Sequence, residues 1–194
     1  MLRFEDDATT NDAEWTVRGS SKARAVSCTP DLDRTCAYVA RVSSKKQDNP
    51  SCAGLLRYCA RHGHWSVFEQ GSLTVEVVTP LAISVQLLRH RSFCFQQFSG
   101  RYQDQNALAE MTKDLEAVGD LFYLPPELRR QDPKNRQNSL PQELGKDTNK
   151  MWGAMEDAYV QAKRSYDSLI EQGVAKEIAR FVLPQGVYPR LYVS

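Results

Sequence analysis

The sequence predicts a fold that mixes helices with strands in a single domain. Residues 73–78 alternate apolar and polar side chains, which is typical of a strand with one buried face. Threonine followed by proline at 29–30 and at 79–80 indicates two helix starts, because threonine caps free N–H groups and proline fits the first turn. Apolar residues recur at spacings of three and four over 148–172, which predicts an amphipathic helix.

The composition is that of a folded protein and excludes several classes. The 194 residues are 41% hydrophobic and 25% charged, and the formal net charge of +1 gives no general attraction to nucleic acid or to anionic membranes. No apolar run approaches the roughly 18 residues of a membrane span, and the N-terminus lacks the apolar core of a secretion signal. The five cysteines are odd in number and form no CxxC pair, so we expect neither a disulfide framework nor a metal site. A cytoplasmic location follows, which means the host-cell cytoplasm if the chain is viral.

The first half of the chain supplies helices around one clear strand. Residues 1–20 are acidic and lack periodicity, so we expect a poorly ordered arm before a single domain over 21–194. Thr29 should cap the first helix, and Gly63 should end the second. The expected elements are a strand over 22–28, helices over 30–42 and 51–62, a turn over 64–69 and the strand over 73–78.

The second half begins with the helix that follows Thr79. Its apolar residues cover most of its circumference, so we expect a central helix that delivers Arg89 to Arg91 at its C-terminal end. Residues 103–147 are long and polar, which predicts a lid or an insertion. The remaining expected elements are the helix over 148–172 stopped by Gly173, a short helix over 175–183 and a strand that begins near Val187.

The stretch from Gln86 to Tyr102 concentrates groups that bind anions. Three arginines and a histidine lie here without any acidic residue. A guanidinium stays charged and offers a rigid fork of donors, which suits a phosphate or a carboxylate. Two alternatives stay open: a solvated basic face, and a basic nucleic-acid-binding domain. A solvated basic face is disfavoured because phenylalanines follow at 93, 95 and 98. A nucleic-acid-binding domain is disfavoured because the net charge of the chain is near zero.

Arg89-His90-Arg91 followed by seven residues and Ser99 resembles the signature of the flavin-dependent thymidylate synthases. The resemblance covers roughly residues 22–194, and it is nearest to virus- and phage-type members, which share the run over 134–140. Its other matching elements are His64-x-Ser66-x-Phe68-Glu69, Gln86, Arg101-Tyr102 and Glu177-x-Ala-Arg180-x-x-Leu-Pro184.

The resemblance implies a reaction, a fold and an assembly. The reaction is the methylation of dUMP to dTMP with methylenetetrahydrofolate, in which FAD carries the hydride from NADPH. The fold is α+β, with a central antiparallel or mixed sheet and flanking helices. The assembly is a homotetramer whose active sites are shared between subunits, with no metal, no nucleic-acid polymer and no membrane as partner.

The resemblance also implies roles for individual residues. Catalytic roles fall on His64, Arg89, Ser99 and Arg180. FAD contacts fall on Ser66, Arg89, His90, Arg91 and Gln97. Contacts with dUMP fall on Gln86, Arg89, Gln97, Phe98, Ser99, Gly100, Arg101 and Arg180. From the residues alone, His64 could equally be a core histidine, Ser99 could only bind phosphate, and Glu177 with Arg180 could form a helical ion pair.

Two features depart from the family pattern. Gln97 stands where most members have an acid, and an amide cannot act as a carboxylate. The family pattern continues beyond the last strand into a helix with further FAD contacts and an arginine, whereas this sequence ends at Ser194. We therefore expect a C-terminally truncated chain with reduced or absent activity on its own, and the alternative is an inactive flavin- or nucleotide-binding fragment.

Overall fold

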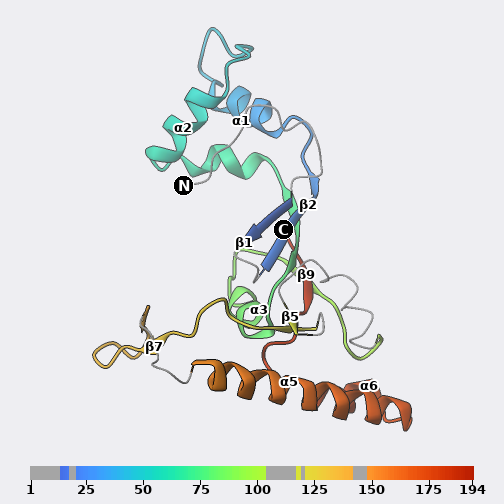
Figure 1. Cartoon of the computed structure of the whole chain (residues 1–194). Helices are drawn as coiled ribbons and strands as arrows, with labels where there is room; N and C mark the ends of the chain where they lie inside the picture. The colour runs from blue at the N-terminus through green and yellow to red at the C-terminus, as the bar shows by residue number, and fades with distance from the viewer. Residues whose placement is uncertain (1–13, 18–20, 104–116, 119–120, 142–147) are drawn as a thin grey trace.

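The computed structural model of the chain describes residues 14–17, 21–103, 117–118, 121–141 and 148–194. The structure combines helices with a five-stranded sheet in which neighbouring strands are all antiparallel, which confirms the predicted α+β class (Figure 1). Along the sheet the strands are β1 (Glu14–Val17), β2 (Ser21–Cys28), β3 (Leu73–Val78), β9 (Arg190–Val193) and β4 (Phe95–Gln97). Strand β1 lies in the segment expected to be an irregular arm; the rest of that segment lies outside the described residues.

The helices before β3 gather at one end of the sheet (Figure 1). They are α1 (Leu32–Ala40), α2 (Ala53–Arg61) and the 3-10 helix η1 (Trp65–Gln70). The two predicted α-helices are confirmed with shorter bounds, and Gly63 has the expected left-handed backbone after α2, with φ of 70°. The expected turn over 64–69 is instead the 3-10 helix.

Neither predicted threonine cap is present. Asp31 is the N-terminal cap residue of α1, and Thr29 instead accepts a hydrogen bond from the Ser72 N–H at its Oγ1, 2.9 Å away. Helix α3 (Leu81–Leu87) begins after Pro80, and the Thr79 hydroxyl lies 2.8 Å from the Ser21 hydroxyl. Both hydroxyls therefore hold strand ends together rather than helix starts.

Helix α3 is not the central helix that its apolar sequence predicts. Only Ser84 of this helix is buried, while Ile83 and Val85 are 44% and 50% exposed in the single chain. The helix does place Arg89 to Arg91 directly after its C-terminal end, as predicted, and all three are exposed.

Strand β3 has one buried face, as predicted, and this face carries Glu76 and Val78. Glu76 is 8% exposed and Val78 is 4% exposed, whereas Leu73 at the start of the strand is 43% exposed. The alternating pattern would have placed Leu73 inside and Glu76 outside. Glu76 can be buried because charged and hydroxyl groups of neighbouring strands surround it, as described below.

A second part of the core joins the long helix to the C-terminal segment. Helix α5 (Thr148–Glu171) ends before Gly173, whose φ is 80°, as predicted. Phe122 in β6 (Phe122–Tyr123) is buried and stacks on Tyr159 of α5, with ring centroids 5.0 Å apart. Part of the segment expected to be a lid or an insertion therefore contributes to the core. Its other described strands are β5 (Ala117–Val118), β7 (Arg130–Gln131) and β8 (Ser139–Leu140).

The short helix predicted over 175–183 is divided into two parts. Residues Lys176–Ala179 form α6, and Arg180–Val182 continue as the 3-10 helix η2. The chain then runs through buried Val187 and Tyr188 into β9. None of the helices that the structure describes is long and apolar enough to cross a membrane.

Candidate functional site

A pocket of about 360 Å³ lies where four segments meet. It is bounded by the start of α3, the end of β4, the 3-10 helix η2 and residues 183–189. The residues that line it are Leu81, Gln97, Phe98, Gly100, Arg180, Phe181, Leu183, Gln185, Val187 and Pro189. Four of these were expected to bind a nucleotide: Gln97, Phe98, Gly100 and Arg180.

Backbone hydrogen bonds fix the walls of this pocket. The Phe98 N–H donates to the Arg190 carbonyl at 2.7 Å, which continues the pairing of β4 with β9. The Leu81 N–H donates to the Val187 carbonyl at 2.8 Å, which attaches the start of α3 to the same C-terminal segment. The pocket is therefore built on paired backbone and not on loose loops.

Arg180 supplies the cation of the pocket. Its guanidinium carbon lies 6.0 Å from the centroid of the Phe181 ring, within the range of a cation–π contact. Within the described part of the chain it makes no ion pair, and the predicted alternative, a helical pair with Glu177, is not formed. An exposed guanidinium without a carboxylate partner is free to bind an anion.

Arg101 lies outside the pocket lining and pairs with Glu177. Its Nε donates to Glu177 Oε2 at 3.2 Å, and both side chains are exposed. Lys176 adds a hydrogen bond from Nζ to the Tyr102 carbonyl at 3.2 Å. These contacts connect α6 to the turn after β4, so Arg101 stands beside the pocket with its terminal nitrogens uncommitted among the described residues.

Ser99 stabilises the turn in which Gly100 is buried. Its Oγ accepts a hydrogen bond from the Arg101 N–H at 3.4 Å, and its carbonyl accepts from the Tyr102 N–H at 3.1 Å. The structure brings no histidine or carboxylate within hydrogen-bond distance of this hydroxyl among the residues it describes. The arrangement suits an anion-binding turn and offers no base to activate a serine nucleophile.

Most of the residues expected to contact a flavin are exposed and lie outside the pocket lining. Arg89, His90 and Arg91 follow α3, and the ring of His90 lies 5.5 Å from that of Phe93. Gln86 is exposed on α3 itself. Gln97, also expected to contact the flavin, is the member of that set that lines the pocket.

Ser66 lies in η1 and His64 directly precedes that helix, so both belong to the group of helices before β3 at one end of the sheet. His64 is exposed, which contradicts the alternative of a core histidine, and its ring lies 6.1 Å from Tyr58 and 6.4 Å from His62. Neither His64 nor Ser66 lines the pocket. One chain therefore does not bring these two residues together with Arg180.

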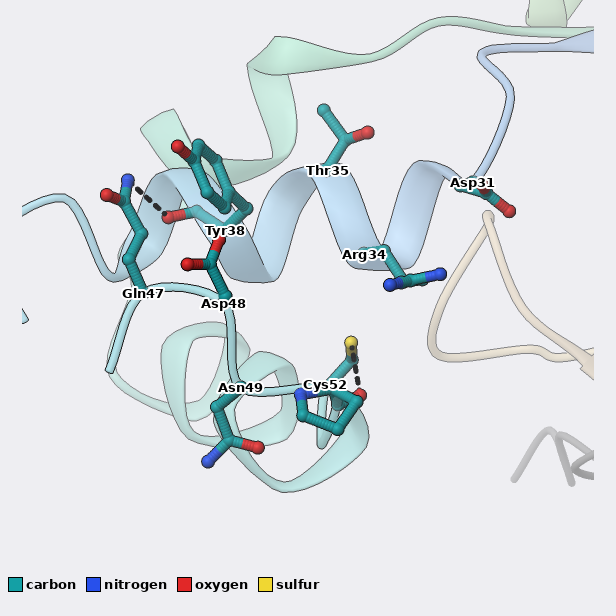
Figure 2. A pocket seen from close by; sticks show the side chains of 9 residues that line it. Asp31, Arg34, Thr35, Tyr38, Gln47, Asp48, Asn49 and Cys52 are labelled. Carbon is teal, nitrogen blue, oxygen red and sulfur yellow. Dashed lines mark hydrogen bonds between the residues drawn. The ribbon is translucent and has the colours of Figure 1, made fainter.

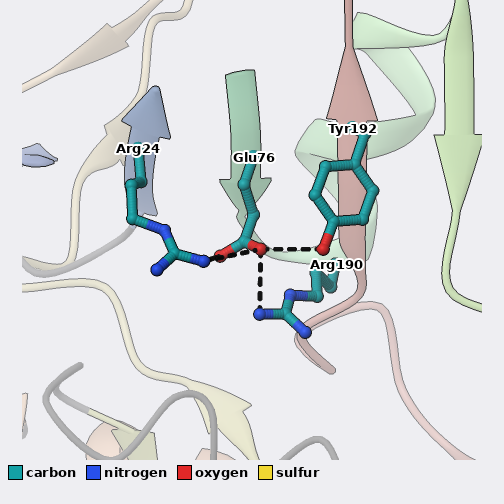
Figure 3. A network of polar contacts seen from close by, with 4 residues as sticks. All are labelled: Arg24, Glu76, Arg190 and Tyr192. Atoms are coloured by element: carbon teal, nitrogen blue, oxygen red, sulfur yellow. Dashed lines mark hydrogen bonds and ion pairs between the residues drawn. The ribbon is translucent and has the colours of Figure 1, made fainter. Parts of the chain in front are cut away.

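A buried carboxylate supports the strand next to the pocket (Figure 3). Glu76 Oε2 accepts the Tyr192 hydroxyl at 2.9 Å and pairs with Arg190 Nη2 at 2.8 Å, and Arg24 Nη2 lies 3.2 Å from both carboxylate oxygens. Burial raises the pKa of Glu76, but the hydrogen bonds from Tyr192 and Arg190 and the charges of both arginines outweigh it and hold the pKa below its ordinary value of 4.5. The network joins β2, β3 and β9 on one face of the sheet.

A second pocket, of about 310 Å³, lies between α1 and the segment that follows it (Figure 2). Arg41 holds this segment in place by donating from Nη1 to the Asn49 carbonyl at 2.8 Å. The pocket's lining residues are Asp31, Arg34, Thr35, Tyr38, Gln47, Asp48, Asn49, Pro50 and Cys52. Its charged side chains are all exposed and solvated, so we assign no ligand to it. No group of three or more metal-ligating side chains occurs in the described ranges.

Several pocket residues were not singled out from the sequence. Phe181, Gln185 and Pro189 line the pocket although no charge or motif position marks them. Their signal was their position around the Leu183-Pro184 step, where the chain leaves a helix and turns back toward the sheet. In the sequence this step marks the end of the predicted helix and the end of the motif that begins at Glu177, and neither feature indicates a pocket wall.

Comparisons with known proteins agree with the motifs. The family model of the thymidylate synthase complementing proteins, Thy1, matches residues 24–194. A flavin-dependent thymidylate synthase of Synechocystis sp. is 42% identical over 159 residues, which are 81% of this chain and 66% of that protein. A "Probable flavin-dependent thymidylate synthase" of Paramecium bursaria Chlorella virus 1 is 40% identical over 163 residues, which are 81% of this chain and 68% of that protein. The chain thus spans about two thirds of the length of these relatives.

Solved structures of similar fold include a UMP/dUMP methylase, PolB, from Streptomyces cacaoi. Its structure bound with 5-Br dUMP has a TM-score of 0.64 at 30% identity, over 89% of this chain and 71% of that one. The same protein bound with 5-Br UMP has a TM-score of 0.66 at 30% identity, over 89% and 70% of the two chains.

Proposed function

This chain belongs to the family of flavin-dependent thymidylate synthases, and from that premise we propose that it methylates dUMP to dTMP. In the overall reaction a methylene group passes from methylenetetrahydrofolate to C5 of the uracil ring, and the C5 hydrogen leaves as a proton. NADPH supplies the hydride that reduces the methylene to a methyl group, so tetrahydrofolate and NADP⁺ are the other products. FAD, when bound, carries that hydride.

The observation that carries this proposal is the pocket that joins Gln97, Phe98 and Gly100 to Arg180. A nucleotide phosphate requires a guanidinium with hydroxyl and backbone donors, and the turn from Ser99 to Arg101 next to Arg180 offers both. The pocket volume of about 360 Å³ falls within the range of roughly 300–1,000 Å³ for small-molecule sites. We assign the phosphate to Arg180 and Arg101, and the sugar to Gln97, whose amide can donate and accept.

The donors after α3 fit a flavin dinucleotide. Arg89 and Arg91 are exposed and form no ion pair within the described residues, so their guanidinium groups can bind the pyrophosphate. His90 with Phe93 adds an aromatic surface for a planar ring, with ring centroids 5.5 Å apart. Gln86 and Arg89 would also reach dUMP. Fixed cations near the nucleotide would stabilise negative charge that develops on the uracil oxygens.

We further propose that complete sites form between subunits of a homotetramer. His64 and Ser66, which we assign to the flavin and the folate, are exposed and do not line the pocket; they lie before the start of β3, whereas the pocket residue Leu81 follows the end of that strand. A second subunit that places these two residues beside the pocket would complete the site. We include a cytoplasmic location in the proposal, because the sequence has an odd number of cysteines and no CxxC pair, which is not the pattern of a disulfide framework.

The test is release of tritium from C5-labelled dUMP by the purified 194-residue chain with FAD, NADPH and methylenetetrahydrofolate. The sequence predicts that this release is reduced. What remains should require all three components and should fall by at least about 100-fold in Arg180→Ala, since loss of a charge-assisted contact to the substrate costs about 1.5–3 kcal/mol and misplaces the ring as well. The matched control is Arg129→Ala, which removes an exposed arginine from the β7–β8 region. A chain that binds dUMP and FAD but releases no tritium would contradict the catalytic proposal and leave a binding module.

A further inference from the structure

Phe181 is an unusual wall for a pocket because 77% of its surface is exposed, although it is one of the lining residues. A phenylalanine left in water forfeits the stabilisation that burial of its ring would provide. Large apolar groups that remain exposed beside a polar pocket mark surfaces that a ligand or a partner covers. The residues around the Phe181 ring indicate which kind of chemical group covers it.

The surroundings of Phe181 indicate an aromatic anion. Arg180, the preceding residue, holds its guanidinium carbon 6.0 Å from the ring centroid. Phe98 lines the same pocket from the strand side. A cation next to two phenyl rings complements a planar ring that carries a phosphate, and the volume of about 360 Å³ suits a mononucleotide better than a dinucleotide such as FAD.

We propose that Phe181 stacks on the pyrimidine ring of the nucleotide and thereby makes the pocket selective for a base-bearing phosphate. This inference rests on the proposed function, since it takes dUMP as the occupant of the pocket. Stacking on a phenyl ring is favourable for any planar base, because both faces are π-systems with complementary dispersion and quadrupole interactions. Phe181 therefore recognises the pyrimidine ring of the nucleotide, while Arg180 binds its phosphate.

Ile178 provides a matched control on the same segment. It is 54% exposed and lies three residues before Phe181, but it does not line the pocket. Truncating either side chain removes a comparable exposed apolar group. Only the Phe181 change should alter how the pocket discriminates between ligands.

The experiment is calorimetric titration of the full chain with dUMP and, separately, with 2-deoxyribose 5-phosphate, which lacks the base. In Phe181→Ala we expect dUMP affinity to fall by roughly tenfold, in keeping with base–aromatic stacking, while affinity for the base-free phosphate stays the same. Phe181→Trp should restore dUMP binding, and Ile178→Ala should leave both affinities unchanged. A titration with FMN in place of dUMP distinguishes a flavin ring from a pyrimidine as the stacking partner.

Three results would overturn the inference. Equal losses for the two phosphates would mean that Phe181 acts on the fold and not on the base, and an unchanged dUMP affinity would mean that the ring is not a stacking surface. A loss seen with FMN but not with dUMP would assign the ring to the flavin. If the unmodified chain binds no dUMP at all, the proposed function fails first, so the two failures are distinguishable.

Discussion

Arg101 and Glu177 form an ion pair between Nε and Oε2 at 3.2 Å, although they are 76 positions apart in the chain. The pair connects the turn after β4 to α6, the two segments that flank the pocket of Arg180. The side chain of Arg101 is 59% exposed, and that of Glu177 is 50% exposed. Exposed pairs contribute little to stability because water screens them, so the value of this pair lies in holding the guanidinium of Arg101 beside the pocket.

Arg101→Ala should therefore separate binding from stability. We expect dUMP affinity to fall by about tenfold or more, since a charge-assisted hydrogen bond is worth about 1.5–3 kcal/mol. The melting temperature should change by no more than about 2–3 °C, which corresponds to less than 1 kcal/mol for a chain of this length. The measurements are calorimetric titration with dUMP and thermal unfolding followed by circular dichroism.

The control for this change is Arg129→Ala, which removes another exposed arginine whose Nη1 lies 2.8 Å from Glu127. Its effect on dUMP affinity should be negligible. If both variants weaken dUMP binding equally, the contribution of Arg101 is only its general positive charge, and the assigned phosphate contact is wrong.

Glu76→Gln should destabilise the sheet in a pH-dependent way. The carboxylate bonds to Tyr192 and Arg190 and faces Arg24, and its pKa is lowered in the fold. A lowered pKa means that folding favours the charged form, so this stabilisation is complete above the ordinary pKa of 4.5 and is lost as the pH falls through the folded value. At neutral pH we expect a cost of about 1–3 kcal/mol for leaving the two arginines without the charge.

The measurement is the free energy of unfolding from urea titrations at several pH values from about 7 down to about 3. The difference between the original chain and Glu76→Gln should be largest near neutral pH and should shrink below the unfolded pKa. Glu127→Gln is the control, because Glu127 is exposed and its ion pair is with Arg129, which is also exposed. A difference that is independent of pH would mean that the charge of Glu76 is not what matters.

Structural features that depend on residues close together in the sequence could be predicted, whereas features that depend on contacts between distant residues could not. Helix α5 and strand β3 were predicted because their patterns are local and repeat along the chain. The burial of Glu76 could not be predicted, since its partner Tyr192 lies 116 residues away. The exposure of the apolar side chains of α3 could not be predicted either. A sequence pattern shows which side chains are hydrophobic, but it does not show whether other parts of the fold cover them.

The residues of the candidate site could likewise be predicted only in part. Gln97, Phe98, Gly100 and Arg180 were named together only because the motifs resemble a known family, and the pocket does contain all four. The clustering of charges alone indicates Arg89 to Arg91 as site residues and does not indicate Phe181. The separation of His64 from the pocket within one chain is a property of the fold that no local pattern carries.

Thr29 offers a direct test of one corrected prediction. Its Oγ1 accepts the Ser72 N–H at 2.9 Å, a contact between residues 43 positions apart. Thr29→Val keeps the shape of the side chain and removes this acceptor, so we expect a loss of about 0.5–1.5 kcal/mol in the free energy of unfolding. Thr35→Val on α1, whose hydroxyl has no such acceptor role in the described structure, should change it far less. Equal small effects would show that the Thr29 contact is not formed.

Gly186 is a position at which any side chain would collide with the core. An added Cβ would lie 2.8 Å from Cζ of Tyr159 and still closer to its hydroxyl oxygen. Tyr159 cannot move away cheaply, because its ring stacks on buried Phe122 at 5.0 Å. We expect Gly186→Ala to reduce the free energy of unfolding by about 1–3 kcal/mol through overpacking.

Gly153 in α5 provides a control of opposite sign. An added Cβ at Gly153 meets nothing within 4 Å, so Gly153→Ala should be neutral or should stabilise the helix by up to about 1 kcal/mol. Urea titration of the two variants measures both effects. Adding Tyr159→Phe to Gly186→Ala should recover part of the loss, because the nearest atom is removed. Additive effects of the two changes would mean that the collision is relieved elsewhere, since coupled neighbours should not add.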